Sequence, residues 1–121
     1  MSKRVLVVED EEDNRRIVHD LLTSVRYEII EAVTGLEGMT AAAAHVPDLI
    51  LMDIQLPGLD GYEATRRIKI NPMLRHIPII VVTSYALSGD DVKAFEAGCD
   101  AYISKPFSPR ALLAKVREYL P

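Results

Sequence analysis

The chain is organised around the stretch Asp48-Leu49-Ile50-Leu51-Met52-Asp53-Ile54-Gln55-Leu56-Pro57-Gly58. Its apolar run from Leu49 to Met52 has strand length and no polar break, which predicts a strand buried on both faces. Such a strand needs helices over both faces of its sheet. Asp53 ends the run at the rim of the core, and Pro57-Gly58 stops the backbone from continuing as strand or helix. An aspartate in this place is usually a turn or cap residue, so a chemical role for Asp53 depends on the other strands.

The remaining apolar runs extend the same pattern. Val5 to Val8 and Ile79 to Val82 predict buried strands, and Ala101 to Ser104 predicts a fifth strand. The partly polar segment from Tyr27 to Ala32 is typical of a strand at a sheet edge. Amphipathic segments separate these runs, so strand and helix alternate five times. Alternating units of this length predict an α/β fold with a parallel sheet, right-handed crossovers and helices on both faces.

Capping residues mark the expected helix starts. These are Thr34 with Glu37, Asp60 with Glu63, Ser88, and Ser108 followed by Pro109. The apolar periodicity predicts that the following helix side chains face the core: Ile17, Val18, Leu21, Leu22, Val25, Leu36, Met39, Ala43, Val46, Tyr62, Thr65, Ile68, Val92, Phe95, Leu112, Leu113, Val116 and Leu120. Met52, Met73 and Cys99 are interpreted as core or near-core residues, and Arg66, Arg67 and Lys69 as a solvated helix face.

Length and composition exclude several classes of protein. The 121 residues fit one domain, over residues 1–121 with no output domain. Fourteen basic and eighteen acidic residues give a net charge of −4, and no basic stripe is present, so we expect no direct nucleic-acid partner and no membrane. A single Cys99, no signal-peptide core and no membrane-spanning run indicate a cytoplasmic location.

Polar side chains follow the apolar strands where each strand ends. In open α/β sheets, ligands bind beyond the carboxyl ends of the strands, where the strand order reverses. The residues at these ends are Glu9, Asp10, Asp53, Thr83 and Lys105. If the strand order is 2-1-3-4-5, the acids lie on neighbouring strands at the reversal. Because charge clusters at a buried edge are costly without a purpose, we interpret this group as a functional site.

The chemistry of this group favours a divalent cation. Carboxylates repel by roughly 4 kcal/mol per pair at 4 Å and an effective dielectric constant near 20, so three of them need a counter-ion. Oxygen ligands without Cys or His point to Mg²⁺. A solvated acidic loop is the alternative, and it suits residues 11–13, but Glu9 and Asp10 come directly out of an apolar strand. With Mg²⁺ present, a carboxylate such as Asp53 can attack phosphorus and form an aspartyl phosphate.

Four motifs match a known family in order and spacing: Val7-Val8-Glu9-Asp10-Glu11, Leu51-Met52-Asp53-Ile54-Gln55-Leu56-Pro57-Gly58, Val82-Thr83-Ser84 and Lys105-Pro106-Phe107. Through them the chain resembles a response-regulator receiver domain, the CheY-like family, from end to end. The resemblance implies a flavodoxin-like (βα)5 fold, a doubly wound sheet of five parallel strands in the order 2-1-3-4-5.

The resemblance also implies a role for each site residue. The implied metal ligands are Asp10 and Asp53 directly, Glu9 through water, and Gln55 by its backbone carbonyl. Asp53 resembles the phosphoacceptor, and Lys105 the phosphate-binding lysine before a cis peptide bond at Pro106. Thr83 resembles the switch hydroxyl and Tyr102 the switch aromatic residue. Glu9 stands where Asp is commoner in the family.

The implied function is that of a two-component response regulator. It would accept a phosphoryl group on Asp53 from a histidine kinase or histidine phosphotransfer protein in a Mg²⁺-dependent reaction. It would catalyse only its own phosphoryl transfer and dephosphorylation, so it is not an enzyme in the ordinary sense. The signal would pass to a downstream protein target through the Ser88 to Ala97 helix, the fifth strand and the Pro109 to Leu120 helix. We further hypothesise that Tyr85, at the mouth of the site, slows loss of the phosphoryl group.

Other functions fit the sequence less well. A phosphatase with an aspartyl intermediate normally has a second acid where this chain has Gln55. No G-x-G-x-x-G motif follows a strand, and acidic residues 9–13 would repel a flavin phosphate. Two alternatives stay open: a receiver domain excised from a hybrid histidine kinase, and a binding module of the same fold that works without phosphorylation.

Overall fold

The structure, a computed structural model, describes residues 2–83 and 90–121. Within these ranges strands and helices alternate along the chain, as the sequence predicts. The elements are β1 (Arg4–Val8), α1 (Glu12–Ser24), β2 (Glu28–Ala32), α2 (Gly35–His45), β3 (Leu49–Asp53), α3 (Gly61–Ile70), β4 (Ile79–Thr83), α4 (Asp90–Ala97), β5 (Ala101–Ser104) and α5 (Pro109–Tyr119).

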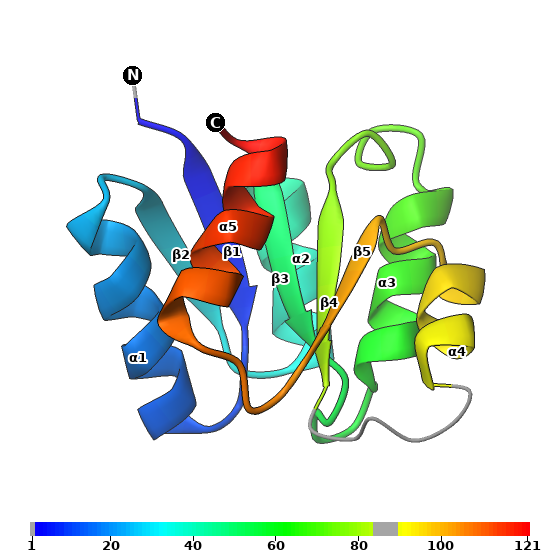
Figure 1. The fold of residues 1–121 in the computed structure, drawn as a ribbon. Coiled ribbons are helices and arrows are strands. Elements are labelled where there is room, and N and C mark those ends of the chain that lie inside the picture. Colours follow the sequence, from blue (N-terminus) through cyan, green and yellow to red (C-terminus); the bar gives the residue numbers. More distant parts are fainter. Residues whose placement is uncertain (1, 84–89) are drawn as a thin grey trace.

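The strands form one parallel sheet in the order β2-β1-β3-β4-β5, which confirms the expected topology. Figure 1 shows α1 and α5 on one face of this sheet and α2, α3 and α4 on the other. Because all strands run in one direction, their carboxyl ends meet along one edge, opposite the edge where the two chain termini lie (Figure 1). The described helices are all too short or too polar to cross a membrane.

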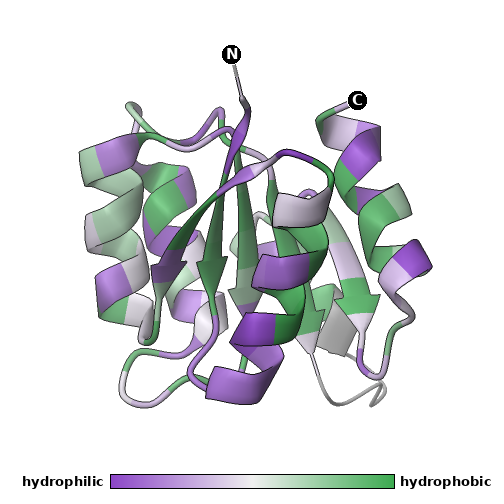
Figure 2. Cartoon of the chain, turned by 90° about the vertical axis from the view of Figure 1, so that its left-hand side faces the viewer, coloured by the Kyte–Doolittle hydropathy of each residue, from purple (hydrophilic) through white to green (hydrophobic). Residues whose placement is uncertain are grey.

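Each face of the sheet has its own apolar core. Ile50 and Met52 of β3 pack with the α2, α3 and α4 side, whereas Leu49 and Leu51 pack with the α1 and α5 side. This alternation follows from the two-residue repeat of a strand. Figure 2 shows the largely apolar central strands between helices that carry both polar and apolar residues. The central strand is therefore buried on both faces, as its unbroken apolar run predicts.

Three predicted helix caps are present. The hydroxyl of Thr34 accepts a hydrogen bond from the Glu37 amide at 3.0 Å, and Asp60 and Ser108 cap α3 and α5 in the same way. Each cap satisfies an amide that the helix itself leaves unpaired. The proposed cap Ser88 lies outside the described residues.

The face of α2 that packs on the sheet differs from the predicted face. Leu36, Ala43 and Val46 are exposed, and the buried positions of α2 are Gly35, Gly38 and Ala42. A Cβ atom on Gly38 would lie 2.9 Å from a methyl group of Val8, so this helix approaches β1 too closely for a large side chain. The prediction was therefore wrong for Leu36, Ala43 and Val46, whereas Met39 packs partly buried against the core as predicted.

The outer face of α4 shows the same difference. Val92 and Phe95 are 54% and 53% exposed, whereas the small residues Ala94 and Ala97 are buried. The prediction that Val92 and Phe95 face the core was therefore wrong. As in α2, short side chains let the helix lie close to the sheet, and the larger side chains point outward.

Other single predictions also failed. Ile17 and Met73 are 57% and 76% exposed, although both were expected in or near the core. Lys69 is not part of a solvated face, because its ammonium group donates hydrogen bonds to the carbonyl of Ile77 and to Asp100, both at 2.8 Å. A lysine near the end of α3 is long enough to reach the loop before β4, which local periodicity does not reveal.

Candidate functional site

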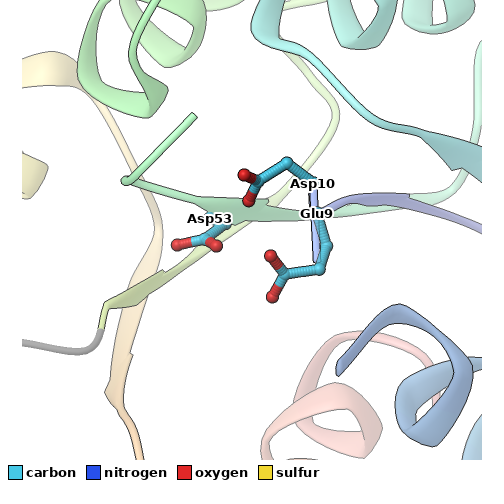
Figure 3. A group of neighbouring side chains, drawn as sticks. All are labelled: Glu9, Asp10 and Asp53. Atoms are coloured by element: carbon cyan, nitrogen blue, oxygen red, sulfur yellow. The ribbon is translucent and has the colours of Figure 1, made fainter. Parts of the chain in front are cut away.

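Three carboxylates meet where the strand order reverses. Glu9 and Asp10 follow β1, and Asp53 ends β3, which is the next strand in the sheet. Ligand oxygens of the three residues lie within 4.8 Å of one another. Figure 3 shows the carboxylates of Glu9, Asp10 and Asp53 around one shared space. Glu9 and Asp53 are only 6% and 5% exposed, while Asp10 is exposed to solvent, so the site is a buried acidic group with one open side.

Backbone contacts hold Asp53 from two directions. Its Oδ1 atom accepts a hydrogen bond from the Gln55 amide at 3.2 Å. Behind it, α3 begins so close to the strand end that a Cβ atom on Gly61 would lie 2.1 Å from the Asp53 carbonyl oxygen. The Gly61 amide also donates a hydrogen bond to the Ile54 carbonyl at 3.0 Å. The phosphoacceptor predicted from the sequence thus sits on a backbone that has little room to move.

Lys105 brings the fifth strand into the same group. Its ammonium nitrogen lies 2.7 Å from Glu9 Oε1 and 3.4 Å from Asp53 Oδ2, and its side chain is 17% exposed. Its amide donates a hydrogen bond to the Thr83 carbonyl at 2.6 Å, which joins the ends of β4 and β5. The Lys105-Pro106 peptide bond is cis, as the resemblance implied.

Burial and the neighbouring charges shift the pKa values of Glu9 and Lys105. Burial raises the pKa of Glu9, and the neighbouring Asp53 raises it further, which together outweigh the opposite effect of Lys105. Burial alone would lower the pKa of Lys105, but the hydrogen bond to Glu9 and the charge of Asp53 outweigh it and raise that pKa above its ordinary value. Lys105 therefore carries a full positive charge at neutral pH, between two acids.

The two predicted switch residues lie on one face of the sheet. Thr83 ends β4 and is 1% exposed. Tyr102 of β5 pairs in register with Val81, two residues before Thr83, and packs partly buried against the core on the α2, α3 and α4 side. Because side chains two residues apart point to the same face, Thr83 also faces that core. Tyr85 lies outside the described residues.

A cleft of about 360 Å³ opens beside the acids, between α1 and the start of α5. Glu9, Asp53 and Lys105 line its polar side. Its apolar side includes Phe107 and Ile17, the α1 residue that is exposed instead of facing the sheet.

Sequence reasoning overlooked Arg15, the residue that bonds the backbone of the acid pair. Its guanidinium donates a hydrogen bond to the Glu9 carbonyl at 3.0 Å and makes a longer contact to the Asp10 carbonyl at 3.4 Å. Only its place one turn into the helix that follows the acids could have pointed to it, and the next residue, Arg16, shares that signal.

The donor set fits a hard divalent cation. Its side-chain ligand atoms are all carboxylate oxygens, from Glu9, Asp10 and Asp53. Two of these oxygens already lie near a cation, the ammonium of Lys105. Magnesium is typically bound through a few carboxylates and waters, with the remaining positions left for phosphate oxygens. The exposed position of Asp10 leaves such an open side.

The model of the response regulator receiver domain family matches residues 5–117. The chain belongs to this family. A relative described as the polar-differentiation response regulator DivK of Brucella ovis is 46% identical over 120 residues, covering 99% of this chain and 98% of the relative. The receiver domain therefore acts in two-component signalling, in which receiver domains interact with histidine kinases and downstream targets.

Solved receiver domains have the same fold. One from a sensor histidine kinase of Pseudomonas aeruginosa PAO1 has a TM-score of 0.92 at 34% identity, covers 99% of this chain and 98% of its own, and has a magnesium ion coordinated in its active-site cleft. A CheY-like receiver domain protein from Methanospirillum hungatei JF-1 has a TM-score of 0.90 at 36% identity, covering 99% of this chain and 94% of its own. The predicted family and fold are thus confirmed.

Proposed function

We propose that this receiver domain accepts a phosphoryl group on Asp53 from the phosphohistidine of a histidine kinase or histidine phosphotransfer protein. An oxygen of the Asp53 carboxylate attacks phosphorus, the new oxygen–phosphorus bond forms, and the bond to the donor's histidine nitrogen breaks. The observation that carries this proposal is the position of Asp53, buried between the Gln55 amide at 3.2 Å and the Lys105 ammonium at 3.4 Å. These donors orient the carboxylate and leave it beside the open cleft.

The acidic group is suited to hold Mg²⁺ during this reaction. Glu9, Asp10 and Asp53 would be the side-chain ligands. The backbone carbonyl of Gln55, which the family resemblance implies as a ligand, would complete the protein ligands. When bound, Mg²⁺ would neutralise the carboxylates and draw in the phosphoryl oxygens. The magnesium in the Pseudomonas aeruginosa receiver supports this choice of cation.

Lys105 and Thr83 are suited to bind the transferred group. The Lys105 ammonium is close enough to Asp53 to pair with a phosphoryl oxygen, and its raised pKa keeps it charged. Thr83 ends the adjacent strand β4, one residue after Val82, the register partner of Asp53. Its hydroxyl would move toward a phosphoryl group on Asp53 when that group is present. A shift of Thr83 toward phosphate would change the space beside Tyr102, giving two alternative packings of one face.

The proposed output surface comprises α4, β5 and α5. Its α4 part exposes Val92 and Phe95, and exposed apolar side chains that lie close together are typical of protein contacts. A downstream protein would bind this face with an affinity set by phosphorylation of Asp53.

Intact-mass measurement with a small phosphodonor tests the proposal. We expect one phosphate adduct with Mg²⁺ present, no adduct in EDTA and no adduct on Asp53→Asn. Beryllium fluoride, which stands in for the phosphoryl group, should then shift amide NMR signals of Tyr102 and α5 as well as those of Asp53. An adduct that survives Asp53→Asn would contradict the assignment of the acceptor. Shifts confined to the acidic site would instead favour a binding module that does not switch.

A further inference from the structure

The turn between β1 and α1 carries two of the three acids. The Glu9 amide donates to the Ala32 carbonyl at 3.0 Å and the Glu11 amide to Glu9 Oε2 at 3.3 Å, and one further side chain, Arg15, bonds the carbonyls of both acids. Arg15 Nη1 donates to the Glu9 carbonyl at 3.0 Å and approaches the Asp10 carbonyl at 3.4 Å. On its other side, Arg15 Nε lies 3.2 Å from the Glu31 carboxylate on the edge strand β2. The Arg15 side chain is 18% exposed, so this guanidinium is held between the turn and the sheet edge.

These contacts fix the backbone of two acids that lie beside a third. Glu9, Asp10 and Asp53 bring their oxygens within 4.8 Å, and like charges at this distance repel, so the site needs a backbone that keeps the acids in place. The side chain of Glu11, at the N-cap of α1, makes no capping hydrogen bond within the described residues. The guanidinium therefore supplies a restraint on this turn that the helix cap does not provide.

We infer that Arg15 is a positioning residue for the cation site: it holds the backbone of Glu9 and Asp10 so that their carboxylates face Asp53 before Mg²⁺ binds. This inference rests on the proposed function, because it assumes that the acids bind Mg²⁺. Arg15 acts through the two carbonyls, since its contacts are to backbone oxygens and to Glu31. Groups that orient metal ligands in this way typically contribute 10- to 100-fold to metal affinity.

The sign of the effect separates positioning from simple charge. Arg15 is a cation near a cation site, so electrostatics alone predict that its removal strengthens Mg²⁺ binding. Positioning predicts the opposite. Arg16 provides a matched control, because it is the neighbouring residue and carries the same charge, but it is exposed and pairs with Glu12 on the surface of α1.

The experiment is a calorimetric titration of Mg²⁺ into wild type, Arg15→Met and Arg16→Met, with free energies of unfolding measured in EDTA. We expect Arg15→Met to bind Mg²⁺ about tenfold more weakly. Arg16→Met should bind it as tightly as wild type or slightly more tightly. The phosphorylation rate of Arg15→Met should fall below that of wild type at limiting Mg²⁺, and the Mg²⁺ concentration for half-maximal rate should rise by the same factor as the dissociation constant. A merely structural role would lower the free energy of unfolding without changing the Mg²⁺ dissociation constant of the folded protein.

Equal or tighter Mg²⁺ binding by Arg15→Met would overturn the inference and leave the proposed function intact. Failure of wild type to bind Mg²⁺ would instead overturn the proposed function. If Arg15→Met does not fold, Arg15→Lys replaces it, because lysine keeps the charge and the aliphatic stem but lacks the planar fork that spans the carbonyls and Glu31. Arg15→Lys should also bind Mg²⁺ more weakly, and wild-type affinity in that variant would contradict the role.

Discussion

Replacing Lys105 by Met should destabilise the metal-free receiver domain and make its stability depend more strongly on Mg²⁺ than that of wild type. Lys105 lies between Glu9 and Asp53, at 2.7 and 3.4 Å from their nearest oxygens. Methionine keeps much of the side-chain volume but removes the positive charge, so both acids lose their counter-charge. The Glu9 and Asp53 side chains are only 8% and 6% exposed, and solvent therefore screens them poorly.

The size of the loss follows from this burial. Breaking a buried ion pair by removing one partner costs about 3–5 kcal/mol. Because the Lys105 side chain is 17% exposed and Asp53 keeps its hydrogen bond from Gln55, we expect the lower end, about 3 kcal/mol, in EDTA. Mg²⁺ can replace the lost charge, and it no longer competes with the ammonium for the same oxygens. If its affinity rises tenfold, the deficit shrinks by about 1.4 kcal/mol at saturating Mg²⁺.

Urea unfolding of wild type and Lys105→Met, in EDTA and in saturating Mg²⁺, measures both quantities. Lys115→Ala is the control, since its pair with Glu118 is a partly exposed contact between neighbouring turns of α5 and should contribute less than about 0.5 kcal/mol. Equal stability of wild type and Lys105→Met in EDTA would refute the reasoning. So would a deficit that Mg²⁺ leaves unchanged or increases.

Two further predictions concern packing and pH. Gly61→Ala should lower the free energy of unfolding in urea by about 2 kcal/mol or more, because its Cβ would lie 2.1 Å from the Asp53 carbonyl oxygen. The control Gly58→Ala, at φ +74° in open space, should cost only about 1 kcal/mol, and equal costs would contradict the close approach of α3. Burial raises the pKa of Cys99 from 9.0 to about 11, so the thiol ionises at lower pH in the unfolded chain than in the folded protein. The stability advantage of wild type over Cys99→Ala should therefore fall by up to about 2 kcal/mol from pH 9 to 11. Parallel curves of stability against pH for the two proteins would contradict this prediction.

Local signals in the sequence predicted the elements because the physics behind them is local. The short, unbroken apolar run Leu49 to Met52 predicts a strand covered on both faces, and β3 is one. The Thr34 and Asp60 caps work within a single helical turn, so their spacing alone identifies them. The strand order came from the resemblance, since periodicity does not say which strands are neighbours.

Predictions that depended on contacts between distant segments were less reliable. Which face of α2 is buried depends on how closely that helix approaches β1, and the glycine at Gly38 decides this through a contact with Val8. Lys69 looked solvated because its partner Asp100 lies 31 residues away. Arg15 was overlooked for a related reason, because its role rests on backbone carbonyls, which every residue carries.

The packing of α4 suits it to be the element that the site moves. Among its described side chains, residues 92–97, the ones that anchor it in the core are Ala94 and Ala97, while the large side chains Val92 and Phe95 face outward. A buried methyl or methylene group contributes about 0.8 kcal/mol, against about 1.5–3 kcal/mol for a fully buried large apolar side chain. Displacing α4 therefore costs less than displacing α3, which is anchored by the fully buried Ile68. Allosteric coupling is typically worth about 1–3 kcal/mol, a range that one new charged contact at Asp53 can supply. A helix whose described side chains bury only two alanines is within reach of that energy, and under the proposed function its exposed valine and phenylalanine would be where a partner senses its position.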